Sequence, residues 1–302
     1  MKTHITLLDG GMGRELKRMG APFRQPEWSA LALIEAPETV TEAHAAFITA
    51  GAEVIITNSY ALVPFHIGET RFAADGQSLA ELSGRLARAA ADAVTGRKVR
   101  VAGSLPPLFG SYRPDLFDSA RAPELLAPLV AGQAPHVDLW LGETLGSIAE
   151  AEAVRTALGS DPRPLWISYT LADKDIDPEA ARLRSGEPAA DAARAAARLG
   201  AAAVLFNCSQ PEVMAPALGS ARGALGAIGA DIPLGAYANA FPPKNESAQA
   251  NQEASDLRDD LDPVDYLDFA RDWVARGATI IGGCCGIGPE HIAALRAEFA
   301  ST

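Results

Sequence analysis

Short runs of apolar and β-branched residues recur along the chain and alternate with stretches that have helical spacing. Each run is about one strand long, and nearly all of its positions are apolar, which is typical of strands buried on both faces of a parallel sheet. The runs begin at Ile5, Glu53, Val99, Val137, Leu165, Ala202, Pro233 and Ala278. The pattern therefore predicts eight strands.

The intervening stretches predict amphipathic helices. In residues 39–50, for example, the apolar side chains recur every three or four positions and fall on one helical face. Glycine, the usual residue where a helix ends, stands at Gly51, Gly200 and Gly277. The helices predicted most clearly are Thr39–Ala50, Leu79–Val94, Ser147–Leu158, Ala189–Leu199 and Pro263–Ala275.

Eight strands that alternate with helices favour an α/β fold of the (β/α)8 TIM barrel type. A doubly wound open sheet is the alternative, but it would need fewer strands and a nucleotide-binding loop near its start. We expect residues 1–302 to form a single domain. The long polar stretch 241–263 follows the seventh strand, and we interpret it as a surface excursion and a candidate lid.

Composition and charge exclude several classes of partner. The 302-residue chain is 48% apolar, enough to fill a sizeable core. It carries 26 basic and 38 acidic residues, and no cluster of Lys and Arg suits a phosphate backbone. No segment approaches the ~20 apolar residues of a membrane span, and the first residues lack the apolar stretch of an export signal. We therefore expect a cytoplasmic protein with no nucleic-acid or membrane partner.

The three cysteines, Cys208, Cys284 and Cys285, follow the sixth and eighth predicted strands. The loops at the carboxyl ends of the strands build the active site of such a barrel, so the three thiols should meet on one rim. Three thiolates with a fourth position open are typical of a catalytic zinc site, and the neighbouring glycines allow the turn that adjacent cysteines need. Two alternatives stay open, namely cysteines that only pack and a disulfide between the adjacent pair.

Polar residues and glycines end the other predicted strands as well. They are Asp9, Gly10 and Gly11, then Asn58, Ser59 and Tyr60, then Ser104, then Glu143 and Thr144, then Asn207, and finally Tyr237 and Asn239. Such a rim is expected of an active site, but both acids have ordinary alternatives. Asp9 could cap a helix over residues 13–19, and Glu143 could be a solvated loop acid.

Five motifs in this order resemble the homocysteine S-methyltransferase family, a group of zinc-dependent (β/α)8 barrels. They are DGGMGREL from Asp9, GAEVIITNSY from Gly51, GET from Gly142, NCS from Asn207 and GGCCG from Gly282. The resemblance covers nearly the whole chain, and GGCCG after a strand with an upstream NC is highly specific. It implies an enzyme of methionine biosynthesis, with small-molecule substrates and zinc as cofactor. Assembly with further copies of the chain is left open.

The resemblance also implies roles for the rim residues. Cys208, Cys284 and Cys285 would bind zinc and, with Glu143, form the catalytic group. The homocysteine thiol would join the metal, lose its proton and attack a methyl group on a positively charged donor. Asp9 and Glu143 would hold the ammonium group of homocysteine, as a charge-assisted contact.

Further positions would complete the substrate pocket. The backbone N–H groups of Gly10 and Gly11 would receive the homocysteine carboxylate, and Asn58 and Thr144 would contact substrate. Trp28 would face the cationic donor, since a cation is stabilised over an aromatic ring. Tyr60 would line the donor pocket or give the metal an extra ligand, or it would only pack. Trp140 and Tyr169 are other candidates for the donor contact.

The methyl donor is the least determined feature. S-methylmethionine, S-adenosylmethionine or a related sulfonium is expected, with betaine or dimethylsulfoniopropionate as alternatives. The loops GSLPPLFGSYRPD from Gly103 and YANA from Tyr237 depart from those of well-known relatives at the donor side. The short stretch after Cys285 leaves no room for the C-terminal arm of the animal betaine-using enzymes.

Two other functional classes are alternatives. A dinucleotide-binding oxidoreductase would need a third glycine where this chain has Leu16. A non-catalytic metal-binding barrel of the same fold could keep the cysteines, but the presence of both Asp9 and Glu143 favours an enzyme.

Overall fold

The computed structural model describes residues 4–174, 180–242 and 257–299. All eight predicted strands are present in these ranges. They are β1 (Thr6–Leu7), β2 (Val54–Ile56), β3 (Arg100–Leu105), β4 (Leu139–Leu145), β5 (Leu165–Tyr169), β6 (Ala203–Asn207), β7 (Leu234–Tyr237) and β8 (Ala278–Ile281).

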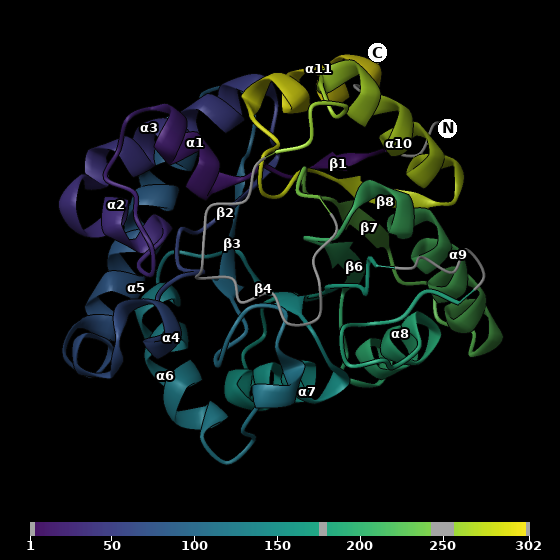
Figure 1. Ribbon diagram of the computed structural model, residues 1–302, viewed down its shortest axis with the longest axis horizontal. Helices are drawn as coiled ribbons and strands as arrows, with labels where there is room; N and C mark the ends of the chain where they lie inside the picture. The colour runs from purple at the N-terminus through teal and green to yellow at the C-terminus, as the bar shows by residue number, and fades with distance from the viewer. Residues whose placement is uncertain (1–3, 175–179, 243–256, 300–302) are drawn as a thin grey trace.

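The strands form one parallel sheet that closes on itself. Its order is β1-β8-β7-β6-β5-β4-β3-β2, and a parallel bridge between Leu8 and Val54 joins the two end strands. Figure 1 shows the strands around the centre and the helices as an outer ring. The predicted (β/α)8 barrel is therefore confirmed.

The helices of the described residues follow the strands, and the five predicted ones are confirmed, four of them to within two residues at each end. The helices are α1 (Met12–Arg18), α2 (Ser29–Glu35), α3 (Pro37–Ala50), α4 (Pro64–Ile67), α5 (Glu69–Asp92), α6 (Ala122–Gln133), α7 (Ile148–Leu158), α8 (Ala189–Arg198), α9 (Pro211–Ala227), α10 (Pro263–Ala275) and α11 (Pro289–Phe299). The largest shift is in α5, which begins ten residues earlier than expected, because its first turns bury little besides Phe72 and Gly76 and so lack a clear apolar period. The expected glycines end their helices at positive φ, 121° for Gly51, 73° for Gly200 and 93° for Gly277.

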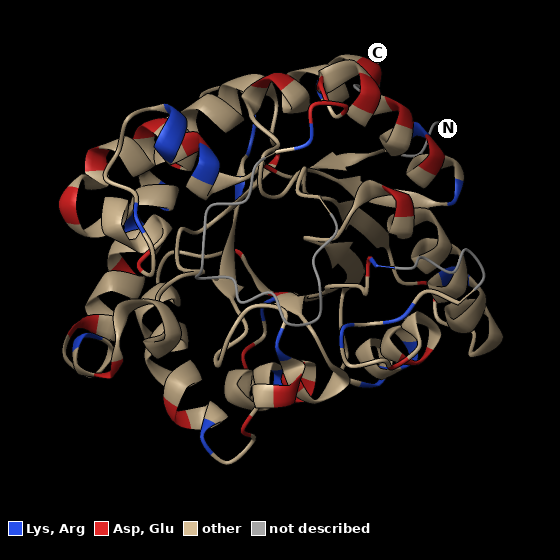
Figure 2. Cartoon of the chain, in the orientation of Figure 1, with Lys and Arg blue, Asp and Glu red and all other residues tan. Residues whose placement is uncertain are grey.

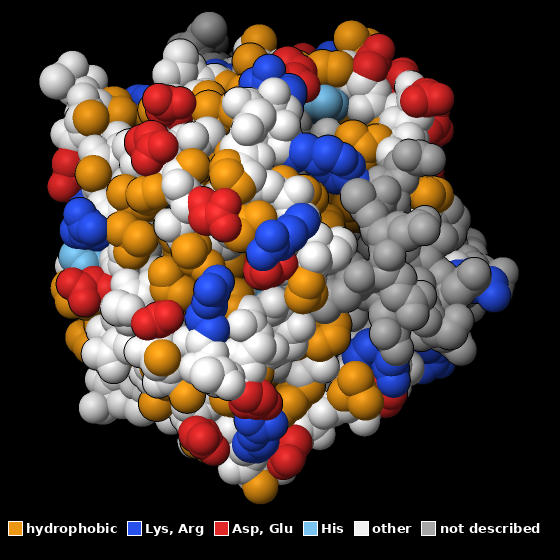
Figure 3. Space-filling view, turned by 60° about the vertical axis from the view of Figure 1, so that its left-hand side comes forward, with side chains coloured by type: hydrophobic (Ala, Val, Ile, Leu, Met, Phe, Trp, Pro, Cys, Tyr) orange, Lys and Arg blue, Asp and Glu red, His pale blue; other side chains and the backbone are white. Residues whose placement is uncertain are grey.

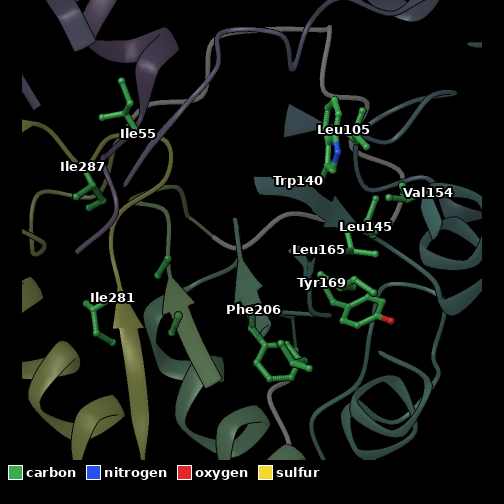
Figure 4. Close-up of a cluster of buried hydrophobic side chains, with 14 of the residues drawn as sticks. Ile55, Leu105, Trp140, Leu145, Val154, Leu165, Tyr169, Phe206, Ile281 and Ile287 are labelled. Carbon is green, nitrogen blue, oxygen red and sulfur yellow. The ribbon is translucent and has the colours of Figure 1, made fainter. Parts of the chain in front are cut away.

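Two hydrophobic clusters hold the barrel together. The larger one lies between strands and helices and includes Trp140, Tyr169 and Phe206 (Figure 4). The smaller one consists mainly of strand residues such as Leu141 and Leu205, which alternate with the first set along β4 and β6 and therefore point into the barrel. This inner cluster forms a packed floor beneath the carboxyl ends of the strands.

Charged residues lie mostly on the outer helices and loops (Figure 2). On the face in Figure 3, acidic and basic side chains are interspersed with apolar ones. No helix among the described residues is long and apolar enough to cross a membrane. Most of the candidate lid, residues 243–256, lies outside the described residues.

Candidate functional site

The inward rows of β4 and β6 change from apolar to polar at their carboxyl ends. Leu141 is followed two residues later by Glu143, and Leu205 by Asn207, so the period of the strand aims both polar side chains into the barrel mouth. A cavity opens there above the inner cluster. It is lined by Asp9, Gly10, Gly11, Met12, Gly13, Trp28, Ser29, Ile56, Thr57, Asn58, Tyr60, His66, Ser111, Tyr112, Glu143, Thr144, Cys208, Tyr237, Phe241, Gly283, Cys284 and Cys285. The predicted metal and substrate residues are among them, apart from Trp140 and Tyr169, the two further candidates for the donor contact.

The three cysteines meet in this cavity. Their sulfur atoms all lie within 4.8 Å of one another, and they form the only cluster of potential metal ligands found in the described part of the chain. None is in a disulfide. Three convergent sulfurs suit a soft or borderline metal ion, so the donor set fits the metal site that the sequence predicts.

The loop that carries Cys284 and Cys285 is tied to the segments that follow β7 and β1. The Cys284 N–H donates to the Ala238 carbonyl (2.8 Å), and the Cys285 carbonyl accepts from the Ala240 N–H (2.8 Å). Gly11 packs against the same loop, where an added Cβ would lie 2.5 Å from the Cys284 carbonyl oxygen. The pair is thus held by backbone contacts on both sides.

Asp9 is buried beside the cavity. One carboxylate oxygen, Oδ2, accepts from the Ile56 N–H (2.8 Å), while Oδ1 has no hydrogen-bond partner among the described residues. Burial raises the pKa of Asp9 well above its usual value, and the charge of Glu143 raises it further. The alternative of a helix cap is wrong, because Gly11 is the N-cap of α1 and receives no side-chain bond.

Glu143 lies within β4 and accepts a short hydrogen bond from the Ser104 hydroxyl. Burial raises its pKa to about 7, although the bond from Ser104 acts in the opposite direction. The alternative of a solvated loop acid is therefore wrong. Two buried carboxyl groups that repel one another create a site where a bound cation would be stabilised.

The prediction for Gly11 needs a correction. Its N–H donates to the Ile287 carbonyl (2.9 Å) and is not free to receive a substrate carboxylate. Gly10 and Gly11 are required by close packing, since a Cβ on Gly10 would lie 2.2 Å from the Ile287 carbonyl oxygen. The sequence shows that glycine is needed there but not which neighbour requires it.

Aromatic side chains form much of the cavity wall. Trp28 and Tyr60 were predicted, and the Tyr60 hydroxyl lies 2.7 Å from the Ser111 hydroxyl rather than on a cysteine. The prediction of Trp140 and Tyr169 as donor contacts is wrong, because both point outward into the cluster between strands and helices (Figure 4).

Sequence reasoning missed His66, Ser111, Tyr112 and Phe241. Tyr112 and Ser111 lie in the quoted loop after the third strand, but no periodic rule says which loop side chains face a cavity. Neither His66 nor Phe241 belongs to one of the five motifs.

Asn58 and His66, which both follow β2 in the chain, hold the loop that carries Trp28 in place. The Asn58 amide donates to the Ser29 carbonyl (3.1 Å), and the His66 ring, through Nδ1, donates to the Pro26 carbonyl (2.8 Å). These bonds bracket Trp28 on both sides along the chain, so they set where its indole lies.

Thr144 is held by β6. Its N–H donates to the Asn207 side-chain oxygen (2.9 Å), and the Asn207 amide donates to the Thr144 hydroxyl (2.8 Å). Its backbone N–H and its hydroxyl are therefore both bonded to Asn207, and the residue lines the cavity beside Glu143.

Backbone strain is concentrated at the cavity. Among the described residues, the non-glycine positions with positive φ are Trp28 (52°), Tyr112 (65°), Thr144 (59°) and Cys208 (52°), and all four line it. Such conformations cost about 1–3 kcal/mol each and persist where the surroundings enforce them, typically at functional sites.

Comparison with known proteins gives a consistent result. Residues 6–299 match the family model described as homocysteine S-methyltransferase. Homocysteine S-methyltransferase of Escherichia coli K12 is 32% identical, over 98% of this chain and 96% of its own length. Homocysteine S-methyltransferase YbgG of Bacillus subtilis is 27% identical, over 97% and 94%. The crystal structure of the metallated form of the homocysteine methyltransferase MmuM from E. coli superposes with a TM-score of 0.77, at 31% identity, and covers 98% of this chain and 97% of that one.

Proposed function

Because the chain belongs to the homocysteine S-methyltransferase family, we propose that it transfers a methyl group from a sulfonium donor to the thiol of homocysteine and so forms methionine. The chain is a methyltransferase, and the proposal concerns its metal, its donor and the roles of its residues. The observation that carries the proposal is the convergence of three cysteine sulfurs within 4.8 Å beside two buried acids.

Zinc, held by Cys208, Cys284 and Cys285, would supply the positive charge that turns a coordinating thiol into a thiolate near neutral pH. The tightly packed loop around Cys284 keeps the three sulfurs converged. Bound substrates would fill the cavity around the sulfurs, and holding the thiolate and the methyl group in line would favour their reaction.

Asp9 and Glu143 would bind the ammonium group of homocysteine. The unpartnered Oδ1 of Asp9 gives that cation an acceptor, and binding it would relieve the repulsion between the two carboxylates. The Gly10 N–H stays our candidate for the carboxylate, and Asn58 would act through the loop of Trp28.

A cationic donor would lie against the aromatic wall. Trp28, Tyr60 and Tyr237 offer ring surfaces in the cavity, and a sulfonium near such a ring gains about 0.5–2 kcal/mol. We favour S-methylmethionine, S-adenosylmethionine or a related sulfonium over betaine or dimethylsulfoniopropionate. Residues 1–302 would act as one homocysteine-binding barrel domain, and the cytoplasmic location stays a prediction.

Metal analysis combined with an activity assay tests this function. Protein purified without chelator should contain about one zinc per chain and should form methionine from homocysteine with at least one of the four named donors. Cys208→Ala should lose both properties. A wild-type protein without zinc, or full activity in Cys208→Ala, would contradict the mechanism. A protein that retains zinc but methylates nothing would favour the non-catalytic barrel.

A further inference from the structure

The loop after β3 brings a tyrosine hydroxyl to one of the three sulfurs. The Tyr112 hydroxyl oxygen lies 2.9 Å from the Cys208 sulfur, while the Asn239 amide nitrogen lies 3.8 Å from the same sulfur. A cysteine bound to a metal is a thiolate and has no proton to give. In that state Tyr112 must be the donor of this hydrogen bond.

The backbone of Tyr112 is strained to make this contact. Its φ is 65°, a conformation that is unfavourable for a bulky side chain. Cys208, the partner, is itself at a positive φ of 52°. Strain at both ends of one contact indicates that the surrounding structure holds the two groups together.

A buried ion pair holds the ring of Tyr112. The Arg184 guanidinium lies over the ring, 5.1 Å from its centre, and pairs with Asp173 at 2.7 Å. The two charged side chains are only 8% and 2% exposed. A planar guanidinium suits such stacking, and its charge draws electron density from the phenol, which strengthens the hydroxyl as a donor.

The other cavity tyrosine on this side has a different partner. Tyr60, which the sequence suggested as an extra metal ligand, has its hydroxyl 2.7 Å from the Ser111 hydroxyl. The neighbouring loop residues Ser111 and Tyr112 therefore contact different groups, and the shorter of the two contacts to the Cys208 sulfur comes from Tyr112.

We propose that Tyr112 is a positioning residue of the metal centre, which fixes the Cys208 sulfur by a hydrogen bond and withdraws part of its negative charge. Less charge on Cys208 leaves the metal more able to acidify the incoming thiol. Arg184 holds the ring in place for this role. The inference rests on the metal centre proposed above, and it adds a residue that acts through Cys208 without being a ligand.

Cobalt(II) is the probe for the test, because it binds thiolates and its sulfur-to-metal charge-transfer band reports the charge on the sulfurs. In Tyr112→Phe the band should move to longer wavelength, and zinc affinity, measured by competition with a chromophoric chelator, should fall about 10-fold. Tyr169→Phe is the matched control. It removes a buried hydroxyl in the outer cluster and should leave both readings unchanged.

A second variant keeps the Tyr112 hydroxyl and changes Arg184, which holds the tyrosine ring. Arg184→Lys retains the charge beside Asp173 but loses the flat group over the ring, so it should shift the band in the same direction by a smaller amount. This variant decides the question if Tyr112→Phe does not fold.

The possible failures are distinguishable. A wild-type protein that binds no cobalt overturns the metal centre and this inference with it. A wild-type protein that binds cobalt while Tyr112→Phe and Arg184→Lys keep the same band and zinc affinity overturns only the role of Tyr112.

Discussion

At the scale of single residues, the cavity contains groups that lower the stability of the ligand-free protein. Asp9 and Glu143 are buried acids with raised pKa values, and four non-glycine residues adopt positive φ. None of these features stabilises the fold. We therefore expect them where ligand binding offsets their cost in free energy.

Glu143 gives the first prediction. Glu143→Ala should raise the KM for homocysteine about 10- to 100-fold, because a charge-assisted contact is worth about 1.5–3 kcal/mol. Zinc content should stay near that of the wild type. Glu150→Gln is the control, since Glu150 is another buried acid with a pKa of about 7 but caps α7 away from the cavity. Loss of zinc in Glu143→Ala would show that the residue supports the metal instead.

His44 gives a prediction about stability and pH. It is fully buried in α3, and neither ring nitrogen has a partner among the described residues. Burial lowers its pKa to about 3, against about 6.5 in the unfolded chain. The unfolded chain therefore binds a proton below pH 6.5 and the folded one does not, so stability is complete above pH 6.5 and is lost as the pH falls.

Urea unfolding at pH 7.5 and pH 5 measures this effect. Between these values the free energy of unfolding should fall by about 2 kcal/mol more in the wild type than in His44→Leu, because each pH unit below 6.5 costs about 1.4 kcal/mol. An equal loss in both proteins would show that His44 is already protonated, or hydrated, in the fold.

Sequence alone predicted part of this residue-scale picture. The cysteines and acids could be found because they end strands and belong to motifs. Tyr112 and the actual partner of the Gly11 N–H could not be found in this way. Loop side chains and backbone contacts depend on tertiary packing, which the local sequence pattern does not predict.

At the scale of elements, strand alternation determines most of the site. Apolar runs identified all eight strands, because strands buried on both faces have nearly continuous apolar sequences. Helices were predicted less completely. The sequence did not single out α6 and α9, since each contains an internal proline, Pro128 and Pro216, and α9 also has several glycines.

The contact between the β1 and β8 loops gives the third prediction. Gly11→Ala would place a Cβ 2.5 Å from the Cys284 carbonyl oxygen and 2.9 Å from the Cys285 Cα, so backbone must shift. We expect a destabilisation of about 1–3 kcal/mol and weaker zinc binding. Gly219→Ala, in α9 with no atom within 4 Å of the new Cβ, should instead stabilise the helix by about 1 kcal/mol. Unchanged zinc binding in Gly11→Ala would mean that this loop contact does not set the sulfur positions.

At the scale of the whole molecule, barrel closure assembles the site from both ends of the chain. Asp9 follows the first strand and Cys284 the last, and β1 pairs directly with β8. The position of the site was predictable from the sequence, because a (β/α)8 barrel gathers its strand ends on one rim. The shape of the donor side was not, because it depends on loop side chains, which follow no strand or helix period.

The central claim is that three cysteine sulfurs hold a zinc ion that also binds the thiol of homocysteine. X-ray absorption at the zinc edge counts the sulfur ligands directly, with and without homocysteine. We predict three sulfurs in the free enzyme and four after homocysteine is added. A count that stays at three on adding homocysteine, or that is below three in the free enzyme, would contradict the account.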